Sequence, residues 1–117
     1  RSSVAKHAVE SGADLINDIS AGSLDEEIFD VISSMKIPYV LMHMQETPQT
    51  MQQNPVYENV FDEVFNFFRE KILLLNEKGI TNIILDVGFG FGKTVEHNFT
   101  LLKRLKEFEI FQLPMLL

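Results

Sequence analysis

Hydrophobic residues along the chain alternate between helical spacing and short continuous runs. Ile28, Val31 and Ile32 follow the helical spacing, in which every third or fourth residue is apolar. Apolar runs such as 82–86 instead indicate buried strands. The pattern predicts helices at 1–10, 25–35, 57–75 and 99–108, the last with Phe99, Leu102, Leu105 and Phe108 on its apolar face, and strands at 13–19, 39–44, 82–86 and from 114 onward.

The order of these elements determines the type of sheet. Strands that are joined by helical crossovers run parallel, and every predicted connection contains a helix. A doubly wound sheet and an eight-stranded barrel both fit this α/β alternation. Polar residues come at or just after the carboxyl ends of successive strands: Asn17 and Asp18, His43 and Gln45, and Asp86. This arrangement favours a (β/α)8 barrel with its site at one rim, of which the chain would form about half.

Composition excludes several classes of protein. The chain has 117 residues, of which 45% are hydrophobic and 23% charged, as in a globular domain. Its net charge of -7 argues against nucleic acid or an anionic membrane as a partner. Without cysteine it has no disulfides, and its apolar runs are too short to span a bilayer. We expect a cytoplasmic protein, and the missing initiator methionine suggests a fragment of a longer one.

The segment 83–93 carries the clearest functional signal. An apolar strand ends in Asp86, and alternating glycines and phenylalanines then lead to Lys93. A phosphate-binding P-loop would need glycine where Val87 stands, and the dinucleotide-binding pattern also fails because its third glycine comes one residue early. We expect one of Phe89 and Phe91 to pack into the core and the other to lie against a flat ligand.

Two interpretations of Asp86 compete. It could cap a turn after its strand, or its carboxylate could accept two parallel N–H groups of a ligand, which we favour because it closes an apolar strand. Asn17 would add an amide beside it, although asparagine is also common in strand-end turns.

Four further residues carry weaker functional signals. His43 stands without other residues at metal-ligand spacing and favours a structural role, so no metal site is visible. Only one of Met42 and Met44 is expected to face the barrel axis. Lys93 is either a solvated surface cation or a contact to the loop or an anionic group.

Four ordered motifs resemble one known family. The motifs lie at 13–19, at 41–45 with 48–52, at 55–57, and at 85–93 with His97 and Asn98. They are similar to those of dihydropteroate synthase, within the wider group of pterin-binding barrels. The resemblance implies that residues 1–117 are the central segment of one barrel domain, from the helix before strand four to the start of strand seven, with both terminal parts missing.

The resemblance also implies a transferase reaction of folate biosynthesis. Family members condense 6-hydroxymethyl-7,8-dihydropterin pyrophosphate with p-aminobenzoate to give 7,8-dihydropteroate and pyrophosphate. Asp86 and Asn17 match the residues that bind the polar edge of the pterin. Ile19 and Met44 match the apolar bed of the pterin ring, and Phe91 matches a loop phenylalanine beside it. No residue of this chain is assigned as a catalytic group.

Other properties follow from the resemblance for the intact enzyme. We expect a homodimer that is a sulfonamide target and uses Mg2+, with the metal ligands outside this chain, and we expect the fragment alone to be inactive. The chain departs from the family pattern at Val87, where proline is usual, and at Glu46, where glycine is usual. The alternatives are a methyltetrahydrofolate-dependent methyltransferase of the same group, a P-loop nucleotide hydrolase, and an inactive binding fragment.

Overall fold

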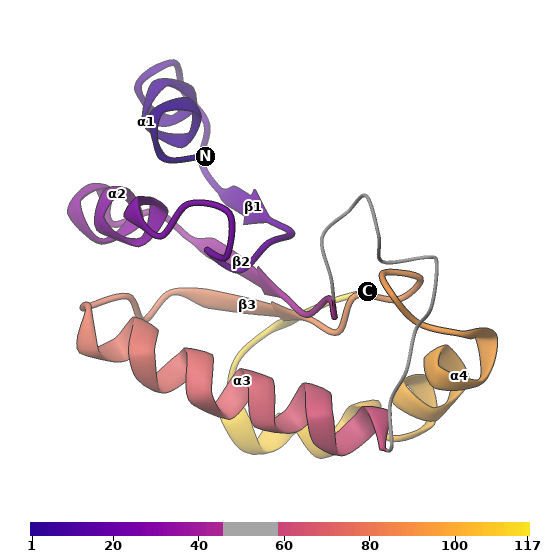
Figure 1. Cartoon of the computed structure of the whole chain (residues 1–117). Helices are drawn as coiled ribbons and strands as arrows, with labels where there is room; N and C mark the ends of the chain where they lie inside the picture. The colour runs from indigo at the N-terminus through magenta and orange to yellow at the C-terminus, as the bar shows by residue number, and fades with distance from the viewer. Residues whose placement is uncertain (46–58) are drawn as a thin grey trace.

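The computed structural model describes residues 1–45 and 59–117, and its centre is a parallel sheet (Figure 1). The strands are β1 (Ile16–Asp18), β2 (Tyr39–Met42), β3 (Ile83–Asp86) and β4 (Met115–Leu116). They lie in the order β1-β2-β3-β4, and each neighbouring pair is parallel. The spatial order of the strands follows the chain order throughout, whereas in a doubly wound sheet it reverses. The prediction of parallel strands arranged as in a barrel is therefore confirmed.

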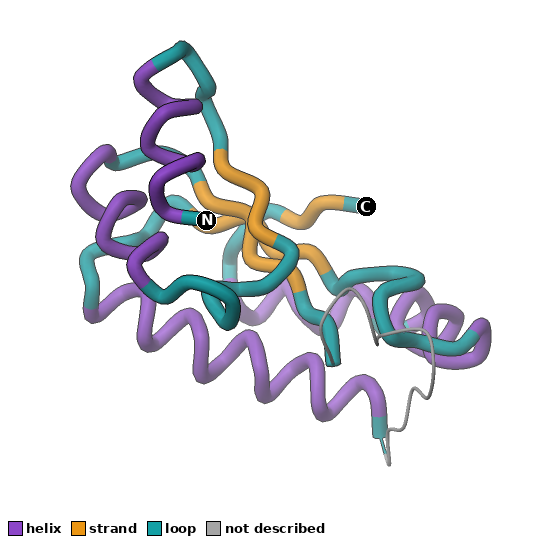
Figure 2. Tube along the Cα trace, turned by 45° about the horizontal axis from the view of Figure 1, so that its top comes forward, coloured by secondary structure: helices purple, strands orange, loops and turns teal. Residues whose placement is uncertain are grey.

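Helices connect the strands and lie around the sheet (Figures 1 and 2). α3 begins after Asn59, whose side chain accepts the N–H of Asp62 at 3.2 Å and so caps the helix. In Figure 1 this helix runs below β3. The helices are α1 (Ser2–Glu10), α2 (Glu27–Met35), α3 (Val60–Glu77), α4 (Val95–Lys103) and the 3-10 helix η1 (Leu105–Phe111).

The register separates two faces of the sheet. Tyr39 pairs with Ile83 and Leu41 with Leu85, and because side chains alternate along a strand, these four residues share one face. They belong to the core cluster that also contains Phe61, Phe68 and Phe108 of the helices. We call this the helix face. Asn17, Val40, Ile84 and Asp86 alternate with these residues and lie on the other side, which we call the inner face.

Aromatic packing holds the helices on the helix face. Phe68 of α3 and Phe108 of η1 are fully buried, and their rings meet edge to face with centroids 5.6 Å apart. Burying a phenylalanine side chain stabilises a fold by about 1.5–3 kcal/mol, and edge-to-face pairs contribute further. This packing fixes the long α3 relative to the end of the chain.

The predicted last helix is wrong in part. It consists of two elements, since α4 ends at Lys103 and a 3-10 helix follows. The side chains of Phe99 and Leu102 are 67% and 53% exposed, whereas Leu101 and Phe108 are buried. The change of helix type near Arg104 alters the rotation per residue, so positions 99 to 108 do not share one face.

Other boundaries differ less. β1 and β2 are shorter than the predicted strands at 13–19 and 39–44. Tyr57, Glu46 and most of the loop predicted at 45–55 lie outside the described residues. No helix in the described part of the chain is both long and apolar enough to cross a membrane.

Candidate functional site

Asn17 and Asp86 lie on the same face at the carboxyl ends of their strands. Asn17 pairs with Val40 and Asp86 with Met42, two positions further along β2, so both side chains are on the inner face. Asn17 is exposed and sits within β1, which removes its interpretation as a turn residue. Its side chain forms no hydrogen bond to the described residues, so the amide is open to a ligand.

Asp86 caps the turn after β3, and its binding to a ligand stays a prediction. Its Oδ1 accepts the Gly88 N–H at 2.8 Å, so the turn-capping interpretation is confirmed. Its Oδ2 accepts no hydrogen bond from residues 1–45 or 59–117, and the residue is only half-buried. One oxygen therefore fixes the turn while the other is open to an external donor.

The turn after Asp86 brings the loop close to the end of β2. Gly88 has a φ of +70°, and a Cβ atom at this position would overlap the carbonyl oxygen of His43. Only glycine allows this approach without strain. Val87, which stands where the family usually has proline, is completely buried in the core. Core packing and the Asp86 hydrogen bond together hold the turn.

Lys93 is not the surface cation that was one of its two interpretations. Its side chain is only 4% exposed, and Nζ donates to the carbonyl oxygens of His43 at 3.2 Å, Gly88 at 3.0 Å and Phe91 at 3.1 Å. Burial lowers the pKa of Lys93 to about 8, and the charge of Asp86 opposes this shift. The ammonium group points into the loop, which also contradicts the lysine placement of a P-loop.

One of the two loop phenylalanines packs against the core as expected, and the contact of the other with a flat ligand stays a prediction. Phe89 packs against the core cluster, and Phe91 is half-buried and lies outside that cluster. The next turn is fixed by Thr94, which caps α4 in a reciprocal pair of hydrogen bonds with His97.

His43 occupies the helix face. It is 5% exposed, and its ring meets the ring of Phe67 edge to face with centroids 5.0 Å apart. Burial lowers the pKa of His43 to about 3, and the positive charge of Lys93 acts in the same direction. The imidazole therefore remains neutral at physiological pH. Its position supports the structural interpretation.

Asp18 differs from its neighbour Asn17 by facing the helices. Its Oδ1 accepts the backbone N–H and the hydroxyl of Ser20 at 2.9 and 2.6 Å. Its Oδ2 accepts the Gly22 N–H at 2.8 Å and the Tyr39 hydroxyl at 3.0 Å. Burial raises the pKa of Tyr39, as does the charge of Asp18. Asp18 thus stabilises the turn after β1 and does not join the polar residues of the inner face.

Which of Met42 and Met44 faces the barrel axis stays a prediction. Both line one cavity of about 240 Å³ that Phe67 and Lys71 of α3 also line. Residues two positions apart tend to point the same way along an extended chain, which explains the shared location. Ile19, the other residue assigned to the apolar bed, is half-buried directly after β1.

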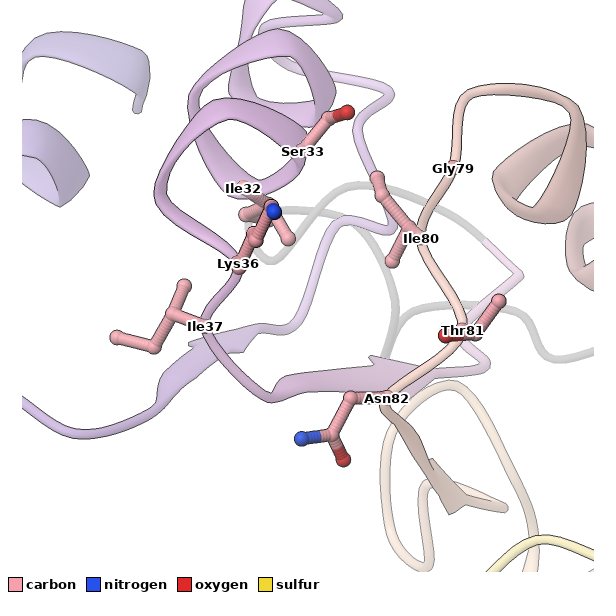
Figure 3. A pocket seen from close by; sticks show the side chains of 8 residues that line it. All are labelled: Ile32, Ser33, Lys36, Ile37, Gly79, Ile80, Thr81 and Asn82. Carbon is pink, nitrogen blue, oxygen red and sulfur yellow. The ribbon is translucent and has the colours of Figure 1, made fainter.

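A larger cavity lies at the opposite end of the sheet (Figure 3). It has a volume of about 390 Å³ and is formed where α2 and the segment before β3 face each other, with Ile32, Lys36, Ile80 and Asn82 among its lining residues. Barrel enzymes react at the carboxyl ends of their strands, and this cavity is at the amino ends. The rim that contains Asn17 and Asp86 is therefore the candidate site.

The described residues do not supply a metal site. Within 1–45 and 59–117, no group of three His, Cys, Asp or Glu side chains is arranged to bind an ion. The residues present therefore do not fit the Mg2+ expected for the intact enzyme.

Comparison with known proteins connects this chain to a family. The family described as pterin binding enzyme matches residues 1–117. The Escherichia coli dihydropteroate synthase is 43% identical over 115 residues, which cover 97% of this chain and 40% of that protein. The Helicobacter pylori bifunctional dihydropteroate synthase/dihydropteroate reductase is also 43% identical, over 96% of this chain and 29% of its own length.

Solved structures agree with these sequence relatives. The Stenotrophomonas maltophilia dihydropteroate synthase with active site-bound imidazole superposes with a TM-score of 0.93 at 39% identity, over 98% of this chain and 44% of that one. The Yersinia pestis enzyme in its sulfonamide drug complex gives 0.92 at 35% identity, over 98% and 42%. The chain thus spans less than half of the relatives it matches, and its sheet is part of their barrel. It belongs to the family of pterin-binding enzymes.

Proposed function

We propose that residues 1–117 are the central segment of a single-barrel dihydropteroate synthase. The reaction joins 6-hydroxymethyl-7,8-dihydropterin pyrophosphate to p-aminobenzoate. The bond between the pterin methylene carbon and the pyrophosphate oxygen breaks, and its electron pair leaves with pyrophosphate. The aniline nitrogen then bonds to that carbon and loses a proton, which gives 7,8-dihydropteroate.

The observation that carries this proposal is the shared inner face of Asn17 and Asp86 in a chain that is 43% identical to a dihydropteroate synthase. The open Oδ2 of Asp86 would accept the ring N–H and amino group of the pterin, and the amide of Asn17 would pair with the same polar edge. A planar ring with adjacent donors fits a carboxylate that is held in place by a turn.

Apolar side chains would complete the pocket. We propose that Ile19 and Met44 form the bed of the pterin ring and that Phe91 lies beside both substrates. Solved relatives support these ligand classes, since Xanthomonas albilineans dihydropteroate synthase was determined with 7,8-dihydropteroate and with 4-aminobenzoic acid. Closely packed aromatic and apolar surfaces would hold the two substrates in line and exclude water.

The reaction does not require a nucleophilic side chain of the protein. When pyrophosphate leaves, positive charge develops on the pterin, and the nearby carboxylate of Asp86 would stabilise it in a site with few competing waters. No described residue is needed as a covalent catalyst in this sequence of steps. The contribution of this segment is to bind, orient and stabilise the pterin.

Further properties are proposed for the intact enzyme. We expect a cytoplasmic homodimer that is inhibited by sulfonamides, and we expect its Mg2+ to be bound by residues outside this chain. Cell fractionation, light scattering and inhibition assays on the full-length protein check these points separately.

The decisive experiment uses the full-length protein that contains this chain. Incubation with the pterin pyrophosphate and p-aminobenzoate should release pyrophosphate and form dihydropteroate, detected by mass spectrometry. Methyl transfer from methyltetrahydrofolate, measured in parallel, should be absent. A protein that binds no pterin and forms no dihydropteroate would contradict the proposal, and methyl transfer would favour the alternative enzyme class.

A further inference from the structure

We propose that Lys93 is a positioning residue, whose ammonium group holds the loop of Gly88 to Phe91 against the end of β2 and thereby places Phe91 beside the pterin. This inference rests on the proposed function. It assigns to Lys93 a role in shaping the site without contact to substrate.

The hydrogen bonds of Lys93 determine what it can do. An ammonium group has three N–H donors, and here all of them are directed at main-chain carbonyl oxygens of His43, Gly88 and Phe91. No donor is left for a phosphate or carboxylate of a ligand. An anion-binding role for Lys93 is therefore incompatible with this geometry.

The three carbonyls belong to two separate segments. His43 directly follows β2, while Gly88 and Phe91 belong to the loop between β3 and α4. The Phe91 N–H also bonds to the Gly88 carbonyl at 3.0 Å, so the main chain around Phe91 is fixed from two directions. Without the ammonium group, each of these carbonyls would lose a hydrogen bond to a charged donor, and the loop would have to move toward water to replace it.

The charge of Lys93 links this arrangement to pH. The ionisable groups around its Nζ are the carboxylate of Asp86 and the imidazole of His43, which stays neutral above its pKa of about 3. Lys93 itself has a pKa of about 8, below the 10.5 of an exposed lysine. As pH rises through about 8, the amine loses a proton and with it one of its three donors. We therefore expect the loop to loosen and pterin affinity to fall.

The first test substitutes Lys93 in the full-length protein. Lys93→Met keeps most of the side-chain volume and removes the charge, and pterin affinity measured by calorimetry at neutral pH should fall about tenfold or more. Lys106→Met, the same exchange at an exposed position, is the matched control and should bind as the wild type does. Equal affinity of Lys93→Met and the wild type would overturn the inference.

A double-mutant cycle tests whether Lys93 acts through Phe91. If it does, the double variant Lys93→Met/Phe91→Ala should bind pterin no more than about threefold more weakly than the weaker single variant. A purely structural role would give losses that multiply, and this result would also overturn the inference.

The pH profile needs no substitution at Lys93, so it decides even if Lys93→Met does not fold. Pterin affinity of the wild type should decrease between about pH 7 and 9. The decrease should be smaller in Phe91→Ala. Titration of the pterin itself affects both proteins equally, so the difference between the two profiles reports on Lys93. An identical profile in the two proteins would exclude positioning through Phe91. Failure of the wild type to bind pterin would overturn the proposed function and this inference together. If the wild type binds pterin but any of the three tests gives its contrary result, this inference alone is overturned.

Discussion

The two faces of the sheet use similar polar residues at its carboxyl end for different purposes. On the helix face, both oxygens of Asp18 accept hydrogen bonds from Ser20, Gly22 and Tyr39. On the inner face, Asp86 uses one oxygen for the Gly88 N–H, and its other oxygen is open. Residues on the helix face should therefore affect stability, and residues on the inner face should affect ligand binding.

The largest expected effect is on stability at the helix face. Asp18→Ala in the full-length protein removes the acceptor of the buried Tyr39 hydroxyl and of two backbone N–H groups, which should lower the free energy of unfolding by about 3 kcal/mol. Denaturant titration measures this loss. Tyr39→Phe, which removes only the hydroxyl, is the matched control and should lose about 1 kcal/mol. An Asp18→Ala protein of normal stability would remove the distinction between the faces.

The second prediction concerns His43, also on the helix face. Its pKa is about 3 in the folded chain and about 6.5 when unfolded, so the unfolded state binds more protons between these values. Stability is full above pH 6.5 and should fall as pH decreases, by about 2 kcal/mol at pH 5. Unfolding curves across this range should show a weaker pH dependence in His43→Gln. The exposed His7→Gln serves as control, and equal slopes in both variants would contradict the prediction.

On the inner face, Asp86→Asn should weaken pterin binding. The amide oxygen still accepts the Gly88 N–H, but the carboxylate that would accept two ligand donors is lost. We expect a cost of about 2 kcal/mol, or about thirtyfold in affinity, with little change in stability. Calorimetry with the full-length protein measures this loss, and Asp14→Asn at an exposed position is the control. Reduced stability with unchanged affinity would show that Asp86, like Asp18, supports the fold and not ligand binding.

The smallest effect is expected at Asn17. Asn17→Ala removes one neutral partner of the pterin edge, so affinity should decrease by about 1 kcal/mol, roughly fivefold. Because Asn17 is exposed in this structure, the free energy of unfolding should be unchanged within error. A loss of stability that exceeds the loss of affinity would show that the inner face also supports the fold.

The sequence predicts the polar residues of the inner face better than those of the helix face. Hydrophobic spacing and polar strand ends suffice to place Asn17 and Asp86 at one rim, because a parallel sheet brings its carboxyl ends together. Asp18 could have been separated from Asn17 by the alternation of side chains along a strand. The sequence therefore contains the signal that places these neighbours on opposite faces.

Other features have no local signal in the sequence. The position of Lys93 depends on carbonyl groups of three residues from two segments, and every residue has a carbonyl group. The separation of the exposed Phe99 and Leu102 from the buried Phe108 depends on a change of helix type near Arg104. Both result from tertiary arrangement, which residue types and their spacing do not specify.

The hydrogen bonds of Lys93 to main-chain carbonyl oxygens have a consequence for evolution. Carbonyl groups persist through any amino-acid replacement, so a substitution at position 91 would change the side chain and keep the hydrogen bond that anchors its main chain. An inhibitor that contacts the aromatic ring at this position could lose affinity for variants that replace the ring and keep the loop conformation. Substitution at position 93 would lack this freedom, since it would release the whole loop at once.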